Sequence, residues 1–437
     1  MSGVILQDYE AVARQGGPAG GWLAGLRQAG LDRFQAAGFP SSRDEDWRFV
    51  NLAPLVAEPF RLAQPGAEGR VTREALAPYL YAIPGVVTLV FVNGRYTPAL
   101  STLPALPAGV TVQPLAAALA AESELLGRHL GRYATPDANG FTALNTAFVK
   151  DGLFVRVAAG VQATAPIHAV FVTAGQAAGA ATHPRNFLLV ERGARVAVLE
   201  SYVGLDDAAY LTNAVTEAIV GDGATLEHTK IQRESERAYH VGTTHIRHGR
   251  DSHGLSFSVS FGAALCRNNL DVILDGPGVD AHMLGLYMGR GRQEVDNHTS
   301  LLHAHPDCGT REIYKGILDG RSHGVFNGKI YVTPIAQKTD AKQTNRALLL
   351  SDTARIDTKP QLEIFADDVQ CTHGATVGAL DQQAAFYLKS RGIGGALARK
   401  ILTYAFAAEV LEEIPHEAVR AALEAVVMQR LEERVEA

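Results

Sequence analysis

The sequence predicts a mainly β protein whose strand-rich core lies between two helical regions. Residues 151–378 contain many short apolar runs that are separated by glycines. No helical pattern interrupts these runs between residues 151 and 365, which excludes a doubly wound parallel sheet. Residues 1–150 are rich in alanine and leucine, and residues 379–437 again follow a helical pattern. We therefore expect three domains with these boundaries.

The N-terminal region is expected to be mostly helical. Residues 116–130 predict one helix, and residues 87–92 predict a short buried strand. A capped helical turn is expected before Trp47, because Ser41 or Ser42 can cap it and acidic residues follow in its first turn. Trp47 itself is interpreted as an anchor in the core or between domains.

The clearest strand of the core is the run from Leu255 to Phe261, in which apolar side chains alternate with serines. Similar runs occupy residues 195–202, 224–232, 270–274 and 324–332. A dozen or more such strands exceed what a simple β-sandwich needs, and their turns repeat at short intervals, as a solenoid requires. Both architectures stay open on the pattern alone, which favours the β-helix only modestly.

The C-terminal region predicts two long helices that are separated at Pro415. The first, residues 396–414, has a broad apolar surface that includes Leu402, Phe406 and Val410. The second carries an apolar stripe at a spacing of four residues, formed by Val419, Leu423, Val427 and Leu431. Two interpretations stay open: a helical hairpin packed on itself, or a docking surface for a partner.

Composition and charge exclude several classes of protein. The 437 residues carry a net charge of −6 and have no basic block, so a nucleic-acid partner is not expected. Three cysteines are too few for a disulfide scaffold. Residues 1–10 lack the pattern of a signal peptide, and no uncharged apolar run reaches the roughly 18 residues of a membrane helix. We therefore expect a cytoplasmic protein without a membrane span.

Common nucleotide-binding and serine-hydrolase motifs are missing. Residues 324–330 have the wrong spacing for a Walker A loop and lack its Ser or Thr. Residues 392–395 resemble part of a dinucleotide loop, but they follow a helix instead of a strand. Residues 254–258 lack the final glycine of a serine-nucleophile elbow. What remains is a set of soft metal ligands.

Cys371 and His373 are the strongest candidates for metal ligands. They lie two residues apart just after an alternating apolar run, so they would project from one face of a continuing strand, about 6.6 Å apart along the backbone. A thiolate and an imidazole suit iron, zinc or copper. Two ligands cannot close a four-coordinate site, so the others must come from elsewhere in the chain or from another chain.

Weaker candidates lie in the core. His303 and His305 would place two imidazoles on one strand face, with Cys308 just beyond. Single histidines in such strands are usually ordinary hydrogen-bonded residues. Cys266 is most simply a buried small hydrophobe, and it would be reactive only near a cation such as Arg267.

Two segments of the sequence closely resemble the signature of the SufB/SufD family, in the form found in SufD. They are residues 354–378, ARIDTKPQLEIFADDVQCTHGATVG, and residues 386–392, FYLKSRG. Residues 42–47 and 405–409 are similar to the N-terminal segment and the C-terminal helix of the same family. The resemblance is dense from residue 325 to residue 413 and sparse elsewhere.

The resemblance implies a right-handed parallel β-helix between helical end regions. It also implies a non-catalytic scaffold subunit, which acts with SufB and the ATPase SufC to assemble a transient iron–sulfur cluster. In that family the histidine of the signature, here His373 with Cys371 beside it, lies at the interface with SufB, and the C-terminal helices are the docking site for the ATPase. A reduced flavin at the level of the complex and a homodimer of the isolated chain are left open.

A metalloenzyme is the alternative function. Its metal site would lie within this chain and would use His303, His305, Cys308, Cys371 and His373. Stoichiometric zinc or iron bound tightly to the chain by itself would favour this alternative over the scaffold.

Overall fold

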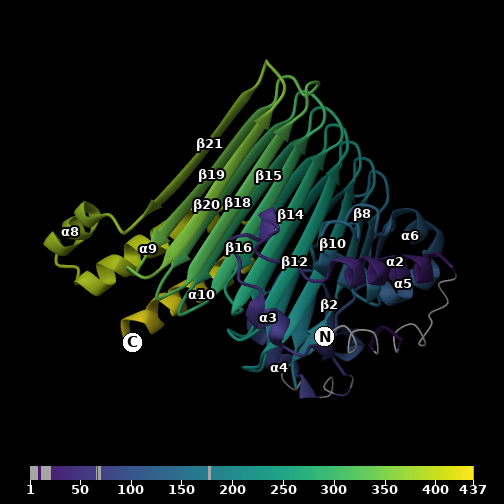
Figure 1. Ribbon diagram of the computed structural model, residues 1–437, viewed down its shortest axis with the longest axis horizontal. Coiled ribbons are helices and arrows are strands. Elements are labelled where there is room, and N and C mark those ends of the chain that lie inside the picture. Colours follow the sequence, from purple (N-terminus) through teal and green to yellow (C-terminus); the bar gives the residue numbers. More distant parts are fainter. Residues whose placement is uncertain (1–7, 11–20, 65, 67–69, 176–178, 437) are drawn as a thin grey trace.

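The computed structural model describes residues 8–10, 21–64, 66, 70–175 and 179–436 of the chain. Long strands lie side by side along most of its length, and the strands that come first and last in the sequence lie at opposite ends of this array (Figure 1). N-terminal helices flank the first strands, and the C-terminal helices lie toward the last ones (Figure 1).

Two long sheets contain all the strands of the described residues. The first sheet consists of β1 (Arg61–Leu62), β4 (Val110–Pro114), β5 (Leu153–Val157), β7 (Ala180–Thr182), β8 (Arg185–Val190), β10 (Tyr210–Val220), β12 (Tyr239–His248), β14 (Leu265–Leu274), β16 (Glu294–His303), β18 (His323–Val332) and β20 (Arg355–Ile364). The second consists of β2 (Val87–Val92), β3 (Arg95–Tyr96), β6 (Ile167–Thr173), β9 (Arg195–Gly204), β11 (Thr225–Arg233), β13 (His253–Ser260), β15 (Asp280–Gly289), β17 (Gly309–Leu318), β19 (Asp340–Leu349) and β21 (Gln370–Gly378).

The two sheets are the two walls of a β-solenoid. Successive strands from β10 to β21 alternate between the sheets, and each pairs in parallel with the strand two places before it. Thr225 of β11, for example, pairs with Arg195 of β9, so one coil takes thirty residues there. The described part of residues 151–378 contains no helix. The predicted solenoid is therefore confirmed, and the sandwich alternative is wrong.

The alternation that predicts β13 has an unexpected orientation. Phe257 and Val259 point out of the solenoid and pack under the C-terminal helices. The serines point inward, where Ser260 accepts a hydrogen bond from Asn268 Nδ2 at 3.0 Å. An apolar face can lie outside the solenoid here because helices exclude water from it.

Inward-facing side chains also fill the solenoid with an apolar core that runs from coil to coil. Its buried members include Val196, Leu226, Val272, Leu301 and Ile330. Each of these residues stacks between residues of the preceding and the following coil. A coil in the middle of the solenoid is therefore covered on both sides. Only a terminal coil can lack such cover.

Six described helices and three 3₁₀ turns precede the central strands. The helices are α2 (Trp22–Ala37), α3 (Ala53–Ala57), α4 (Arg73–Leu76), α5 (Leu115–Ala121), α6 (Ser123–His129) and α7 (Gly140–Ala147), and the turns are η1 (Glu45–Trp47), η3 (Ala77–Tyr79) and η4 (Pro98–Leu100). The first 150 residues also contribute strands, since β2 and β4 extend the two sheets of the solenoid.

The single helix predicted over residues 116–130 is two helices, so that prediction is wrong. The chain bends at Glu122, whose backbone has φ −117° and ψ 30°. The Glu122 carboxylate lies 3.7 Å from Arg156 Nη1 of β5. The bend lets Leu119 of α5 and Leu126 of α6 both pack on the solenoid, which one straight helix would not allow.

The predicted turn before Trp47 exists, but no serine caps it. Instead, the Asp44 carboxylate accepts hydrogen bonds from the Ser41 backbone N–H at 2.7 Å and from its hydroxyl at 3.2 Å. Trp47 is buried, stacks on Phe141 of α7 at 5.3 Å and lies 4.2 Å from the Arg267 guanidinium of β14. The interpretation of Trp47 as an anchor is confirmed.

A buried ion pair holds the segment after α6 on the solenoid. Arg185 Nη2 lies 2.5 Å from Glu217 Oε1, and both side chains are fully buried. The same carboxylate accepts hydrogen bonds from the backbone N–H groups of Gly131 at 2.9 Å and Ala134 at 3.2 Å. These hydrogen bonds compensate for the removal of both charges from water.

Three helices end the chain: α8 (Gln382–Ser390), α9 (Gly395–Leu411) and α10 (Glu417–Glu436). The predicted stripe on α10 is buried against the outer face of the solenoid, with Val419, Leu423 and Val427 completely covered. This stripe packs within the chain and is therefore not free for a partner. None of the described helices is long and apolar enough to cross a membrane.

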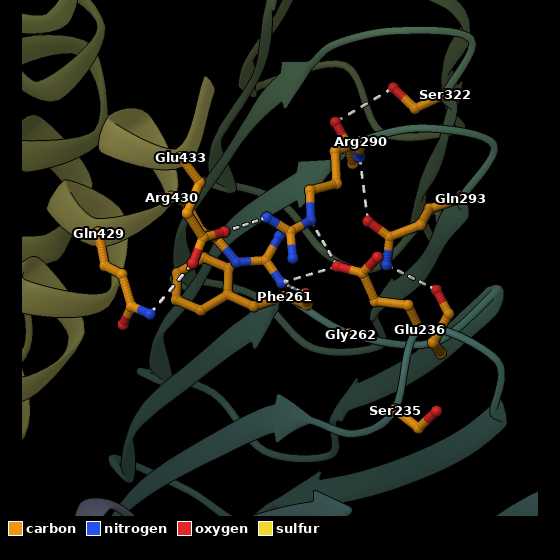
Figure 2. Close-up of polar contacts among 12 residues, drawn as sticks. Ser235, Glu236, Phe261, Gly262, Arg290, Gln293, Ser322, Gln429, Arg430 and Glu433 are labelled. Atoms are coloured by element: carbon orange, nitrogen blue, oxygen red, sulfur yellow. Dashed lines mark hydrogen bonds and ion pairs between the residues drawn. The ribbon is translucent and has the colours of Figure 1, made fainter. Parts of the chain in front are cut away.

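Figure 2 shows how α10 is fastened to the turns of the solenoid. Arg290 forms ion pairs with Glu236 at 2.5 Å and with Glu433 of α10. Arg430 of α10 donates a hydrogen bond to the carbonyl oxygen of Phe261, and its guanidinium lies 5.5 Å from the centre of the Phe261 ring. Burial lowers the pKa of Arg430 to about 10, so the side chain stays charged at neutral pH. These contacts fix the helix on the outer face of the solenoid.

Candidate functional site

The last coil of the solenoid is open. Within the described chain, β20 pairs only with β18 and β21 only with β19, so each strand ends its sheet (Figure 1). Nearly every residue of β21 is exposed, whereas buried residues recur along β19. The outer edges of β20 and β21 therefore present a row of backbone N–H and C=O groups that no described strand covers.

Cys371 and His373 both lie on β21, and both face the inner side of this last coil. Cys371 is opposite Ala341 of β19, and His373 is opposite Gln343. Ala341 and Gln343 are buried inside the solenoid, and paired residues of parallel strands project from the same face. Cys371 is half-buried and packs against the end of the apolar core, whereas His373 is exposed.

This pair can bind a soft metal, but it cannot enclose one. Burial raises the pKa of the Cys371 thiol, although a hydrogen bond involving the Ala341 backbone lowers it. The thiol is therefore protonated at neutral pH, and it becomes a ligand only when a metal cation displaces its proton. Nowhere in the described ranges do three or more His, Cys, Asp or Glu side chains form a group that could hold a metal ion. Two ligands at an open edge are half of a four-coordinate site.

Polar side chains lie directly behind the open end. Gln343 Nε2 donates a hydrogen bond to Glu312 Oε2 at 2.7 Å, and Asn345 Nδ2 donates one to Thr358 Oγ1 at 2.9 Å. The other carboxylate oxygen of Glu312 and the amide oxygens of Gln343 and Asn345 are buried without a partner in the described structure. Burial raises the pKa of Glu312 to about 7. The open end thus leads into a polar part of the interior that can accept hydrogen-bond donors.

The structure separates His303 from His305, which were expected on one strand face. His303 is the last residue of β16 and is completely buried, with its Nε2 3.1 Å from the Thr310 hydroxyl. Burial lowers its pKa to about 4. His305 lies in the following turn, 3.9 Å from Asp275. His303 is an ordinary hydrogen-bonded residue, because the strand ends before His305 can share its face.

The other two cysteines are sealed inside the molecule. Cys308 donates weak hydrogen bonds to the carbonyl oxygens of Gly276 and Pro306, both at 3.4 Å. Cys266 is completely buried, and burial raises its pKa to about 11 even though Lys230 lies close enough to lower it. Arg267 does not activate Cys266, because neighbouring residues of a strand project from opposite faces, and the buried Arg267 side chain pairs with Asp296 and lies over Trp47. The intrachain metal site of the metalloenzyme alternative is therefore not supported.

A polar network inside the first coils was not predicted from the sequence. Glu200 accepts a hydrogen bond from Thr216 at 2.8 Å and lies 3.0 Å from His228 Nε2. Lys230 Nζ donates to Asn268 Oδ1 at 2.8 Å, and it would lie only 2.0 Å from a Cβ at Gly242. The signal was available, because His228, Lys230 and Gln232 stand at alternate positions of β11. Lys230 pairs with Glu200 of β9 in the adjacent coil.

Exposed apolar side chains gather on α8 and the first turns of α9. Phe386 is 72% exposed, Tyr387 56%, Leu397 53% and Ile401 39%. The predicted docking residues lie farther along α9 and are more covered. Leu402 and Phe406 are half-buried, and Val410 is buried in the core between α9, α10 and the solenoid.

Val410 is therefore not part of a docking surface, because a side chain that is only 1% exposed cannot contact a partner. Phe406 is held in place by Lys315 of β17, whose Nζ donates to the Phe406 carbonyl oxygen at 2.9 Å and lies 4.6 Å from the ring centre. The free apolar surface is the one formed by α8 and the start of α9.

Comparison with known proteins now identifies the family. Residues 171–406 match the family model of the SufBD core domain of SUF system FeS cluster assembly, and residues 18–169 match that of the SufBD N-terminal region. The chain belongs to the SufB/SufD family. The two matches together span the N-terminal helices, the solenoid and most of α9.

Relatives of this SufB/SufD family chain match it over nearly their whole length. An iron–sulfur cluster assembly SufBD family protein of Synechocystis sp. is 35% identical over 94% of this chain and 91% of its own length. The iron–sulfur cluster assembly protein SufD of Escherichia coli is 33% identical over 92% of both chains. SufD of Bacillus subtilis is 27% identical over 94% of both. The resemblance of residues 354–378 to the family signature is confirmed by these matches.

Proposed function

We propose that this chain is a SufD-type scaffold subunit on which an iron–sulfur cluster is assembled together with SufB and the ATPase SufC. One observation carries the proposal: the last coil is open and presents Cys371 and His373, two soft ligands that leave a four-coordinate site incomplete. A subunit that supplies part of a ligand set needs another chain to complete it. The relatives named SufD support the assignment.

The open edge of β20 and β21 is the proposed contact with SufB. An exposed strand edge binds a second chain by adding its strands to the sheet, and the main-chain hydrogen bonds supply much of the affinity. Ile364, Phe365 and Val377 are exposed apolar residues at this end, and such a contact would cover them. A second copy of the same chain presents the same edge, so we expect the isolated protein to form a homodimer in competition with the SufB complex.

Within that contact, His373 is proposed as the principal cluster ligand and Cys371 as its neighbour. His373 is exposed, so its imidazole can reach an iron atom held between two chains. Cys371 is half-buried and starts as a protonated thiol, so we assign it the smaller share of the binding. His303, His305, Cys308 and Cys266 have no role in this proposal.

The surface on α8 and the start of α9 is the proposed docking site for the ATPase. Four exposed apolar side chains on two consecutive helices form a larger patch than scattered surface residues do. The chain has no Walker A motif, and we therefore propose a non-catalytic subunit whose partner hydrolyses ATP. The proposed location is the cytoplasm. A reduced flavin would act at the level of the complex, and we assign no residue of this chain to it.

The ligand assignment is tested in a complex reconstituted from this chain, SufB and SufC. We expect His373→Ala to leave the complex assembled and to reduce iron and acid-labile sulfide to less than half of the wild-type content. Cys371→Ser should reduce them less, or equally. Iron and sulfide are measured per complex after cluster assembly, together with thermal melts of each variant.

His253→Ala is the matched control, because His253 is also exposed but lies at the start of β13, far from the last coil in the sequence. It should change neither cluster content nor melting temperature. Full cluster occupancy in a well-folded His373→Ala complex would falsify the ligand assignment.

The docking assignment is tested with Phe386→Glu combined with Leu397→Glu. Both side chains are more than half exposed, so the fold should tolerate the charges. We expect the double variant to lose coelution with SufC while keeping its contact with SufB. Leu103→Glu, an exposed leucine of the N-terminal region, is the control. Normal binding of SufC by the folded double variant would place the docking site elsewhere.

A further inference from the structure

A hollow of about 500 Å³ lies where the N-terminal segment after Trp47 meets the first residues of β12, β14, β16, β18 and β20. Its floor is a row of paired residues that crosses five neighbouring strands: Tyr239, Leu265, Glu294, His323 and Arg355. This volume is in the range of small-molecule sites. The hollow lies outside the proposed cluster and ATPase sites.

The two ends of the hollow differ in chemistry. At one end of the floor lie Tyr239 of β12 and Leu265 of β14, and Phe49 and Pro54 of the N-terminal segment add apolar surface to the lining. At the other end Arg292, Arg321 and Arg355 line the hollow. One end therefore suits a planar ring, and the other suits an anion.

The three arginines have no partner of their own. None of them forms an ion pair or a side-chain hydrogen bond with any residue in the described ranges, whereas Arg195, Arg247, Arg311 and Arg346, also exposed on the solenoid, each pair with a carboxylate. Arg290 lies only two residues before Arg292 in the same turn. Unlike Arg292, it forms ion pairs, with Glu236 and with Glu433 of α10. Three unpaired guanidinium groups around one hollow form a strong field for an anion.

The carboxylate at the floor does not cancel this field. Glu294 is the single acidic residue among those that line the hollow, and it lies 3.3 Å from His323 Nδ1. His323 Nε2 lies 2.7 Å from Asp357. The His323 imidazole thus pairs with both neighbouring carboxylates, and the three arginines remain free to bind an anion.

We propose that the hollow binds a nucleotide or a similar small phosphate ester, with its planar ring toward Phe49 and Tyr239 and its phosphates toward the three arginines. Guanidinium groups bind phosphate oxygens in pairs of parallel hydrogen bonds, and an aromatic wall stacks on a planar base. The ligand would bridge the N-terminal segment and the coils of the solenoid from β12 to β20. This binding is independent of the cluster site, so failure of one proposal leaves the other standing.

The test is isothermal titration calorimetry of the full chain by itself with ADP, inorganic pyrophosphate and adenosine at low salt. We expect ADP to bind, and pyrophosphate and adenosine each to bind at least tenfold more weakly, because each carries only half of the recognised chemistry. The combined variant Arg292→Gln, Arg321→Gln, Arg355→Gln should lose at least tenfold in affinity for ADP. Phe49→Ala should weaken ADP binding and leave pyrophosphate binding unchanged.

Arg250→Gln is the matched control, because Arg250 is an exposed arginine on a turn that follows β12, at the opposite ends of the strands. It should bind ADP like the wild type, and thermal melts of all variants should coincide. The proposal is overturned if the wild type does not bind ADP, if the folded triple variant binds it as tightly, or if pyrophosphate binds as well as ADP.

Discussion

The middle and the end of the solenoid give the same residue type opposite properties. Cys266 on β14 and Cys371 on β21 both face the inside of a coil. Cys266 lies between the neighbouring strands β12 and β16 and is completely buried, whereas Cys371 has only β19 beside it and is partly exposed. The inward position therefore does not decide burial. The presence of a next coil decides it.

This difference explains why a repetitive fold can carry one specialised end. Each middle coil is sealed by its neighbours and by helices, so its polar residues must find partners within the chain. The last coil keeps the same backbone geometry, but its edge and its inward side chains are free. The same pattern of residues thus stabilises the middle of the molecule and supplies binding groups at its end.

The largest contrast should appear in thiol reactivity. Cys371 should react with DTNB in the native protein, whereas Cys266 and Cys308 should react at least about 10³-fold more slowly, because both need unfolding to become accessible. The reaction is followed by absorbance with and without denaturant. Cys371→Ser should abolish the fast phase. Two or three fast thiols in the native protein would show that the middle coils are not sealed.

The second-largest contrast between the middle and the end of the solenoid should appear when a phenylalanine is replaced by alanine. Phe257→Ala removes a fully buried ring between β13 and the C-terminal helices and should cost about 3–5 kcal/mol of unfolding free energy. Phe365→Ala just after β20 removes an exposed ring and should cost less than about 1 kcal/mol. Urea unfolding monitored by circular dichroism measures both. Equal losses would contradict an open last coil.

A buried histidine of the middle should make stability depend on pH. The pKa of His303 is about 4 in the folded protein and near 6.5 when unfolded, so the unfolded chain binds the proton first as pH falls. The stabilisation from the neutral, buried imidazole is complete above pH 6.5 and is lost progressively as the pH falls to 4. The total loss is about 3 kcal/mol. His303→Gln should flatten the fall of stability between pH 7 and pH 4.

Urea unfolding of the wild type and of His303→Gln at pH 4, 5, 6 and 7 measures this difference. The same slope in wild type and His303→Gln would mean that other groups, such as His248 with a pKa of about 4, dominate the acid transition.

The smallest effect is expected for an ion pair that joins the last coil to its neighbour. Lys329 Nζ of β18 lies 2.7 Å from Glu363 Oε1 of β20, and both side chains are 41% exposed. Lys329→Gln should change the unfolding free energy by less than about 1 kcal/mol, and added salt should reduce the difference. A larger loss in urea unfolding would show that β20 depends on side chains more than on its ladder with β18.

Much of the fold could be predicted because its signals are local. Residues 87–92 form β2 as predicted, and the runs at residues 195–202 and 324–332 lie within β9 and β18. The signature segment also placed Cys371 and His373 on one strand. The helix expected over residues 116–130 failed at Glu122, because a contact with a distant arginine and two separate packing sites favour a bend.

Most of the solenoid strands and the common face of Cys371 and His373 could be predicted from the sequence, because each depends on periodicity within a few residues. Only the tertiary structure decided that the phenylalanines of β13 point outward, that Cys266 is sealed while Cys371 is open, and that Arg292, Arg321 and Arg355 share one hollow. Each of these features depends on which coil or helix lies next to a strand, and such neighbours lie 30 residues away along the chain for adjacent coils and 169 residues away for Arg430 and Phe261.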